Sequence, residues 1–118
     1  NIFGGAEMSV IVYQTFVVKQ EKFKEAIENL REIKKLRKDN FNHKVEILTP
    51  ISGNDHTYAL LSTYDGLAEM EWQNKKMFDD EGYLELIGPF FLENIVQGSL
   101  QTQLYRSMAE VKKEKKKE

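Results

Sequence analysis

The stretch SVIVYQTFVVK, Ser9–Lys19, decides the fold because it is apolar on both of its alternating faces. β-Branched and aromatic residues dominate it, which predicts a β-strand. One face carries Val10, Val12, Phe16 and Val18, and the other carries Ile11, Tyr13 and Val17. A sheet covered by helices on one side only would alternate apolar and polar side chains. A second layer must therefore cover the other side of this strand.

Downstream of this strand, the sequence predicts two helical regions and three further strands. The expected elements are a helix over Glu21–Asn40, strands over Lys44–Ile51 and Thr57–Tyr64, a helical region over Asp65–Val96 and a strand over Leu100–Met108. Pro50 predicts an edge position for the second strand, and Gly88-Pro89 predicts a break or kink in the second helical region. The order β-α-β-β-α-β is typical of the α+β ferredoxin-like fold, a four-stranded antiparallel sheet with helices on one face.

The chain length of 118 residues fits one domain. We expect that domain to span residues 8–108, because Met8 directly precedes the first strand. Asn1–Glu7 reads as a leader or cloning remnant. Residues 109–118 read as a charged tail, since Lys112–Glu118 holds five Lys and two Glu and no apolar residue.

Composition excludes several classes of function. The chain has no Cys, which removes disulfides, thiolate nucleophiles and Cys-based metal sites. Its formal net charge of -2 gives no positive field for nucleic acid. No apolar stretch approaches the ~20 residues of a membrane-spanning helix. With only two His, we expect no metal and no cofactor, and a cytoplasmic location by default.

The uncovered side of the sheet predicts an assembly. The domain has no spare element that is long enough to cover it, so a second copy of the chain is the economical cover. We therefore expect a homodimer in which two sheets pack face to face.

At this point the chain resembles the dimeric α/β-barrel superfamily, with NIPSNAP-like proteins nearest and antibiotic-biosynthesis-type monooxygenases related. The resemblance covers residues 8–108 and rests on the element order, the doubly apolar strands and the segment 58–106. Its specific points are Tyr64–Glu69 (YDGLAE), the aromatic-plus-proline stretch Tyr83–Phe91 and the ending Leu104–Arg106 (LYR). It implies a dimer whose strands enclose a cavity. Members use that cavity for cofactor-independent oxygenation, haem degradation, isomerisation or dehalogenation.

The two histidines and the single tryptophan each allow two interpretations. His43 is either a base at the cavity mouth or a partly exposed turn residue, and His56 either shares a metal with Asp55 or lies at an exposed loop tip. Trp72 lies where haem-degrading relatives place a tryptophan beside the haem, but no His follows residue 56 to ligate the iron. Haem degradation is therefore not expected, and Trp72 reads as core or interface.

A pocket needs apolar lining and a few convergent polar groups. The residues that we expect to line it, or else to form plain core, are Tyr13, Gln14, Phe16, Tyr58, Tyr64, Trp72, Phe78, Phe90 and Tyr105. Gln14 falls on the otherwise apolar Val12/Phe16 face, so its amide either bonds across the sheet or dimer or points at a ligand. His43, Gln14 and Tyr105 are the candidates for catalysis.

Two functions follow, and the sequence leaves open whether the protein is an enzyme. One is a dimeric barrel that binds a small apolar or aromatic ligand, with monooxygenase-like chemistry as its extension. The other is a non-enzymatic homodimeric interaction module with a packed barrel. Enclosed volume distinguishes them, since a ligand site of ordinary size holds about 300 Å³ or more.

Overall fold

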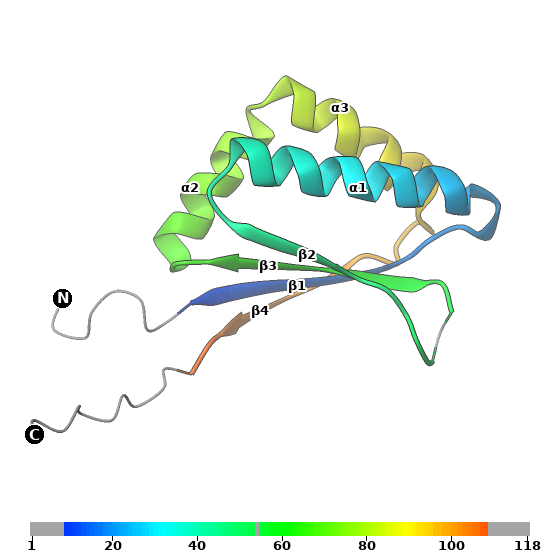
Figure 1. Ribbon diagram of the computed structural model, residues 1–118, viewed down its shortest axis with the longest axis horizontal. Coiled ribbons are helices and arrows are strands. Elements are labelled where there is room, and N and C mark those ends of the chain that lie inside the picture. Colours follow the sequence, from blue (N-terminus) through cyan, green and yellow to red (C-terminus); the bar gives the residue numbers. More distant parts are fainter. Residues whose placement is uncertain (1–8, 54, 109–118) are drawn as a thin grey trace, which may run out of the picture.

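The computed structural model describes residues 9–53 and 55–108, which form two layers, a sheet and a layer of helices on one of its faces (Figure 1). The elements are β1 (Val10–Val17), α1 (Phe23–Asn40), β2 (Lys44–Leu48), β3 (Thr57–Tyr64), α2 (Leu67–Phe78), α3 (Glu81–Pro89) and β4 (Gln101–Arg106). A 3₁₀ turn, η1 (Gln20–Lys22), precedes α1, and a π-helical turn, η2 (Phe90–Asn94), follows α3. This order confirms the predicted α+β ferredoxin-like fold. The expected leader 1–7 and tail 109–118 lie outside the described residues.

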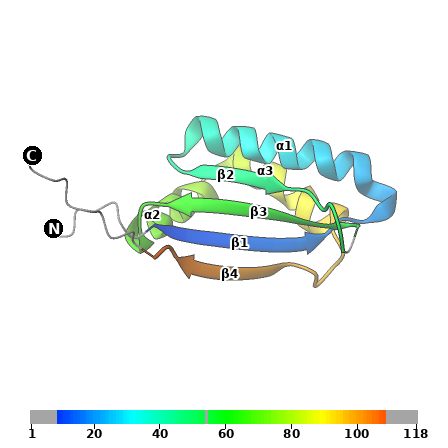
Figure 2. The same cartoon turned by 60° about the horizontal axis from the view of Figure 1, so that its bottom comes forward.

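The sheet is antiparallel, and its strands follow the order β2-β3-β1-β4 (Figure 2). β1 is central, with Val10 opposite Tyr64 of β3 on one side and opposite Arg106 of β4 on the other. β2 is an edge strand, as Pro50 predicted. It ends at Leu48 rather than Ile51, and its last pair with β3 is Leu48 opposite Ala59.

The second helical region differs from the prediction at its proline. Asp80 is the N-cap of α3, and its Oδ1 accepts a hydrogen bond from the Tyr83 N–H at 2.9 Å. The chain does not break at Gly88-Pro89. Pro89 is the last residue of α3, and the wider π-helical turn η2 takes up the irregularity there.

The core lies between the sheet and the helices. Phe16 of β1 is 1% exposed and meets the ring of Phe90 edge-on, with centroids 5.1 Å apart. From α1, Leu30 and Ile33 pack into the same cluster. Edge-to-face contact adds to the burial of these rings, so this pair fixes η2 onto the middle of the sheet.

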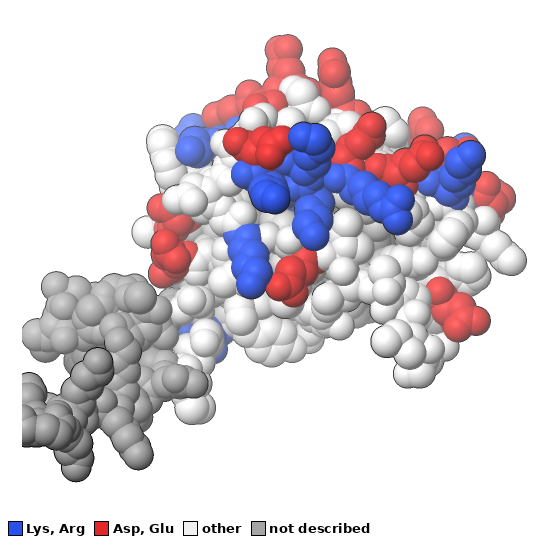
Figure 3. Space-filling view, viewed as in Figure 1, with Lys and Arg blue, Asp and Glu red and all other residues white. Residues whose placement is uncertain are grey.

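The opposite face of the sheet is bare in this chain. No described helix covers it, and Figure 2 brings this side forward. Ile11, Tyr13 and Leu61 lie on it half-buried by their neighbours alone. Charged side chains gather instead over the helical layer (Figure 3). Among the described helices, none is both long and apolar enough to traverse a bilayer.

Candidate functional site

A cavity of about 190 Å³ lies between the sheet and the helices. Val12, Leu60 and Leu104 form part of its floor, and Ile33, Met77 and Phe90 form part of its roof. Leu104 and Phe78 are 51% and 54% exposed, so one side of the cavity opens toward solvent between β4 and α2. The resemblance implied a cavity enclosed by strands, whereas this one lies within a single chain between strands and helices.

Among the described residues that line this cavity, Arg37 has the one cationic side chain. The inward stripe of α1 consists of Ala26, Leu30, Ile33 and Arg37, at steps of four, three and four residues. Arg37 thus occupies a position where the helical period calls for an apolar residue. Its side chain is 4% exposed, which is rare for a cation.

Neutral groups hold the guanidinium of Arg37. Nε and Nη2 donate to Nε2 of His43, at 3.1 and 2.8 Å. Nη2 also lies within donating distance of Ser62 Oγ, at 3.1 Å, and of Tyr64 Oη, at 3.0 Å. Ser62 and Tyr64 are two residues apart on β3, so their side chains lie on the same face of the sheet, the one toward the helices. One end of the cavity is therefore polar, and the rest is mostly apolar.

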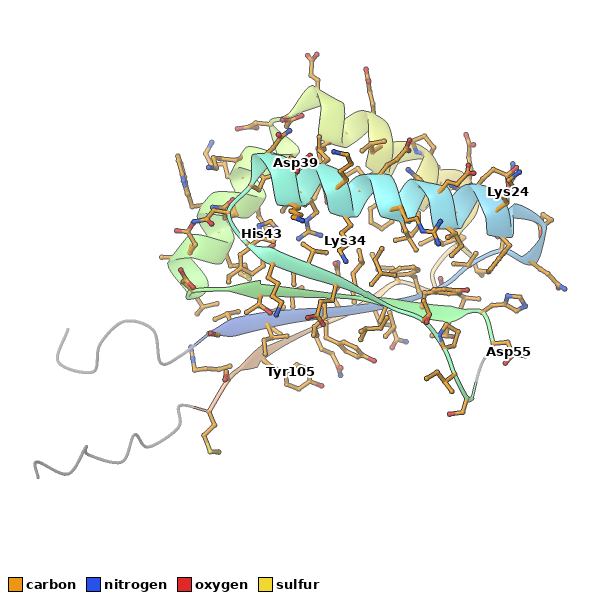
Figure 4. The ribbon with its side chains drawn as sticks, viewed as in Figure 1. Lys24, Lys34, Asp39, His43, Asp55 and Tyr105 are labelled. Carbon is orange, nitrogen blue, oxygen red and sulfur yellow. The ribbon has the colours of Figure 1, made fainter. Side chains whose placement is uncertain are left out.

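His43 lies beneath the C-terminal end of α1 (Figure 4) and in contact with the guanidinium of Arg37. Its ring stacks on Tyr64 with centroids 4.4 Å apart. Burial and the nearby Arg37 charge lower the pKa of His43 to about 4. The imidazole is therefore neutral at neutral pH, and it accepts from Arg37 rather than repelling it. Gln73 of α2 accepts from the Asn42 N–H at 3.2 Å, which fixes the chain just before His43.

The tyrosines of the cavity stay protonated at neutral pH. Burial raises the pKa of Tyr64 and of Tyr83, although the Arg37 charge opposes both shifts. Oη of Tyr64 donates to Asn74 Oδ1 at 3.5 Å. Since no described carboxylate or imidazole lines the cavity, the described walls supply hydrogen-bond donors and one positive charge, and no strong base. Such walls favour negative charge on a bound molecule.

Gln14 makes the bond across the sheet that one of its two interpretations expected, and its role toward a ligand stays a prediction. It lines the cavity, and its Nε2 donates to Oγ1 of Thr102, its partner across β1 and β4, at 3.3 Å. Tyr64, Phe78 and Phe90 also line the cavity.

The other predicted pocket residues lie elsewhere. Phe16 and Tyr58 belong to the packed core. Tyr13 and Tyr105 lie on the bare face, and Tyr105 points away from the helices (Figure 4). Trp72 is 54% exposed, which excludes the core position, and its interface interpretation stays a prediction. Nζ of Lys76 lies 5.6 Å from its ring centroid.

The histidine interpretations change in a similar way. His43 does not line the cavity, and its Nε2 is taken by Arg37. His56 is half-buried rather than at an exposed tip, since its Nδ1 is inaccessible to solvent. Within residues 9–53 and 55–108, no three His, Asp or Glu side chains converge as metal ligands would.

Arg37 is the site residue that the sequence analysis missed. The signal was present, because Arg37 follows Ile33 by four residues on the apolar stripe. Leu36 offered an apolar residue one position earlier and completed the pattern without it.

Comparison with known proteins supports the fold. No family model matches the sequence, and no curated protein matches it either. A NIPSNAP family protein from Agrobacterium tumefaciens superposes with a TM-score of 0.69 at 12% identity, over 85% of this chain and 86% of that one. A candidate antibiotic biosynthesis monooxygenase from Deinococcus radiodurans gives 0.68 at 14% identity, over 90% and 99%. A NIPSNAP-like domain protein from Burkholderia xenovorans gives 0.68 at 10% identity, over 87% of each chain. The chain thus has the ferredoxin-like fold of these two groups, as the resemblance implied.

Proposed function

We propose that this protein binds a small apolar or aromatic molecule in the cavity between its sheet and its helices, as part of a homodimer. The observation that carries this proposal is the cavity itself, with apolar walls and a polar end at Arg37, Ser62 and Tyr64. An apolar pocket with a few convergent polar groups is the usual form of a small-molecule site.

The volume sets the size of the ligand. The cavity of about 190 Å³ falls below the usual lower bound of about 300 Å³ for drug-sized ligands. It exceeds the roughly 150 Å³ of an engineered protein cavity that binds benzene. A ligand with one ring and a short substituent therefore fits.

The homodimer is supported by the bare face of the sheet. Ile11, Tyr13 and Leu61 would stay in contact with solvent there in a single chain, and the two charges of edge strand β2, Lys44 and Glu46, lie 3.4 Å apart as a pair. Two such faces can pack as aligned sheets about 10 Å apart. A second copy of the chain offers a matching apolar face, which makes it the cover that we propose.

Cofactor-independent oxygenation is the reaction class that we propose to test first. Structural neighbours include candidate monooxygenases. A buried cation with hydroxyl donors would stabilise an anionic form of the substrate. Oxygen consumption in the presence of small phenols is the corresponding assay.

Binding can be tested with two neighbouring residues of β4 that lie on opposite faces. Leu104 lines the cavity, Tyr105 lies on the bare face, and the two are 51% and 52% exposed. We expect single-ring aromatic compounds to bind the wild type in ligand-observed NMR. Leu104→Trp should fill the mouth and weaken binding at least ten-fold, and Tyr105→Trp should leave it unchanged.

The alternatives give different results. Loss of binding in Tyr105→Trp alone would place the ligand on the bare face, inside a strand-enclosed barrel. Absence of binding by any compound would favour the second candidate function, a packed interaction module. The observation that favours a packed interaction module is the cavity volume, which is below about 300 Å³.

A further inference from the structure

Arg37 carries a buried charge for which the described chain supplies no counter-charge. The ion pairs among the described residues, Lys35–Asp39, Lys44–Glu46 and Lys75–Asp79, all lie at the surface. Every hydrogen-bond partner that the described residues offer to the Arg37 side chain is neutral. A buried ion without an opposite charge is costly, and proteins normally pair it.

One side of the guanidinium is left for a ligand. Only Nε and Nη2 donate to described groups, so Nη1 has no partner within that part of the chain. Among described side chains, the only buried N or O atoms without a partner are Nδ1 of His43 and Nδ1 of His56. Nη1 is not among these atoms, and Arg37 lines the cavity, so we take Nη1 to be the nitrogen that a molecule in the cavity can meet.

Two hydroxyl groups, those of Ser62 and Tyr64, line the same cavity as Arg37. Ser62 Oγ and Tyr64 Oη lie 3.1 and 3.0 Å from Nη2 of Arg37 and can accept from it, which leaves the proton of each hydroxyl free for another acceptor. The contact from Tyr64 to Asn74 is long, at 3.5 Å. A negatively charged oxygen in the cavity would offer these protons a stronger acceptor, since hydrogen bonds to charged groups are shorter and stronger.

Charge and size limit the anion. A single guanidinium balances one negative charge, which suits a carboxylate better than a phosphate monoester with a charge of about -1.5 to -2 at neutral pH. The planar fork of the guanidinium also matches a carboxylate. The remaining walls, such as Leu60, Met77 and Phe90, suit an apolar ring.

We infer that the cavity selects a compact carboxylate, with its charged end at Arg37 Nη1 and the Ser62 and Tyr64 hydroxyls and its single ring against the apolar walls. This inference rests on the proposed function, because it names the class of ligand for the same cavity. It also gives Arg37 the counter-charge that the described chain lacks. His43, neutral and in contact with the guanidinium, acts as a positioning residue that orients Arg37.

The test compares two probes of nearly equal shape. Benzoate is anionic at neutral pH, and benzamide is its neutral isostere. We expect benzoate to bind the wild-type protein at least ten-fold more tightly than benzamide, measured by NMR titration or calorimetry at low salt. Phenyl phosphate, as a third probe, should bind more weakly than benzoate.

Two variants on α1 test whether Arg37 causes the preference for benzoate over benzamide. Arg37→Met keeps an unbranched side chain of similar reach, and replacement of a buried ion by an apolar residue is often tolerated. It should lower benzoate affinity at least ten-fold and leave benzamide affinity unchanged or improved. Lys38→Met removes the same charge from the next, exposed residue and should change neither affinity.

Results other than those expected would contradict either the inference, the choice of a carboxylate or the proposed function. Equal binding of benzoate and benzamide by the wild type would refute the inference and leave the proposed ligand site standing. Tighter binding of phenyl phosphate than of benzoate would replace the carboxylate by a phosphate monoester. If no probe binds and Leu104→Trp changes nothing, both the inference and the proposed function fail. If Arg37→Met unfolds, Arg37→Gln offers the same comparison with a neutral polar side chain.

Discussion

His43 Nε2 accepts hydrogen bonds from two nitrogens of Arg37, Nε at 3.1 Å and Nη2 at 2.8 Å. The relationship requires a neutral imidazole, because a protonated ring has no lone pair to offer. It joins the last turn of α1 to the residue just before β2, and it sets the direction in which the guanidinium enters the cavity. It also makes the site sensitive to acid.

The first prediction concerns the stability of this pair against pH. The folded pKa of His43, about 4, lies below its ordinary value of 6.5, so the unfolded chain binds more protons between those two pH values. The His43 contribution to stability is therefore complete above pH 6.5 and is lost as the pH falls through 4. An NMR titration should place the His43 midpoint near 4. The melting temperature of His43→Gln should fall less than that of the wild type between pH 7 and pH 4.5. An equal fall in both proteins would contradict the assignment.

The second prediction separates the two faces of β1. Tyr13 lies on the bare face and Val12 on the helix-covered one. Tyr13→Lys should convert the dimer that we propose into folded monomer, seen as a halved mass in sedimentation with unchanged circular dichroism. Val12→Lys should instead destabilise each chain by about 1–3 kcal/mol, because it buries a polar group in the layer beneath the helices. A wild-type protein that sediments as a monomer would refute the dimer.

The third prediction contrasts two aromatic residues. Phe16 is 1% exposed and packs on Phe90, whereas Trp72 is 54% exposed on α2. Phe16→Ala should lower the free energy of unfolding by about 3–5 kcal/mol in urea titrations. Trp72→Ala should change it by about 0.5 kcal/mol or less. A large loss from Trp72→Ala would show that this ring is covered in the assembled protein.

The fourth prediction concerns the start of α3. Asp80 accepts from the Tyr83 N–H, and Asp79 only pairs with Lys75 at the surface, 3.6 Å away. Asp80→Ala should therefore cost about 1 kcal/mol of stability, as the loss of an N-cap does. Asp79→Ala provides the matched control and should cost about 0.5 kcal/mol or less. Equal effects would mean that Asp80 does not cap the helix.

The elements could be predicted because their signals are local. Aromatic, β-branched and other apolar residues between two turns predicted β3 with the bounds Thr57–Tyr64 that the structure has, and three- and four-residue steps predicted α1. Gly88-Pro89 marked the place where the regular α-helix ends, and the structure shows that the chain passes there from α3 into a π-helical turn rather than into a loop. The residues Gly88-Pro89 indicate that the helix changes at this point, but they do not indicate whether a loop or a π-helical turn follows.

The site was predicted only where it depended on one strand. Gln14 was recognised because a lone amide stood out on an apolar face, and it lines the cavity. Tyr13 and Tyr105 were grouped with it by residue type, although alternation along β1 and β4 puts them on the other side of the sheet. Trp72 was expected near the pocket because haem-degrading relatives have a tryptophan on this helix, but its side chain is exposed here.

The sequence by itself determined the order of the elements, the two apolar faces of β1 and the absence of Cys chemistry, since each follows from neighbouring residues or from composition. Only the tertiary structure decided where the cavity lies and that Arg37 is buried in it. Arg37 meets Ser62 and Tyr64 across 25 and 27 residues of chain. Such a meeting depends on how α1 lies over β3, and this is set by packing between distant segments rather than by any local period. A charged residue on an apolar stripe acquires its role only from the groups that this packing brings around it.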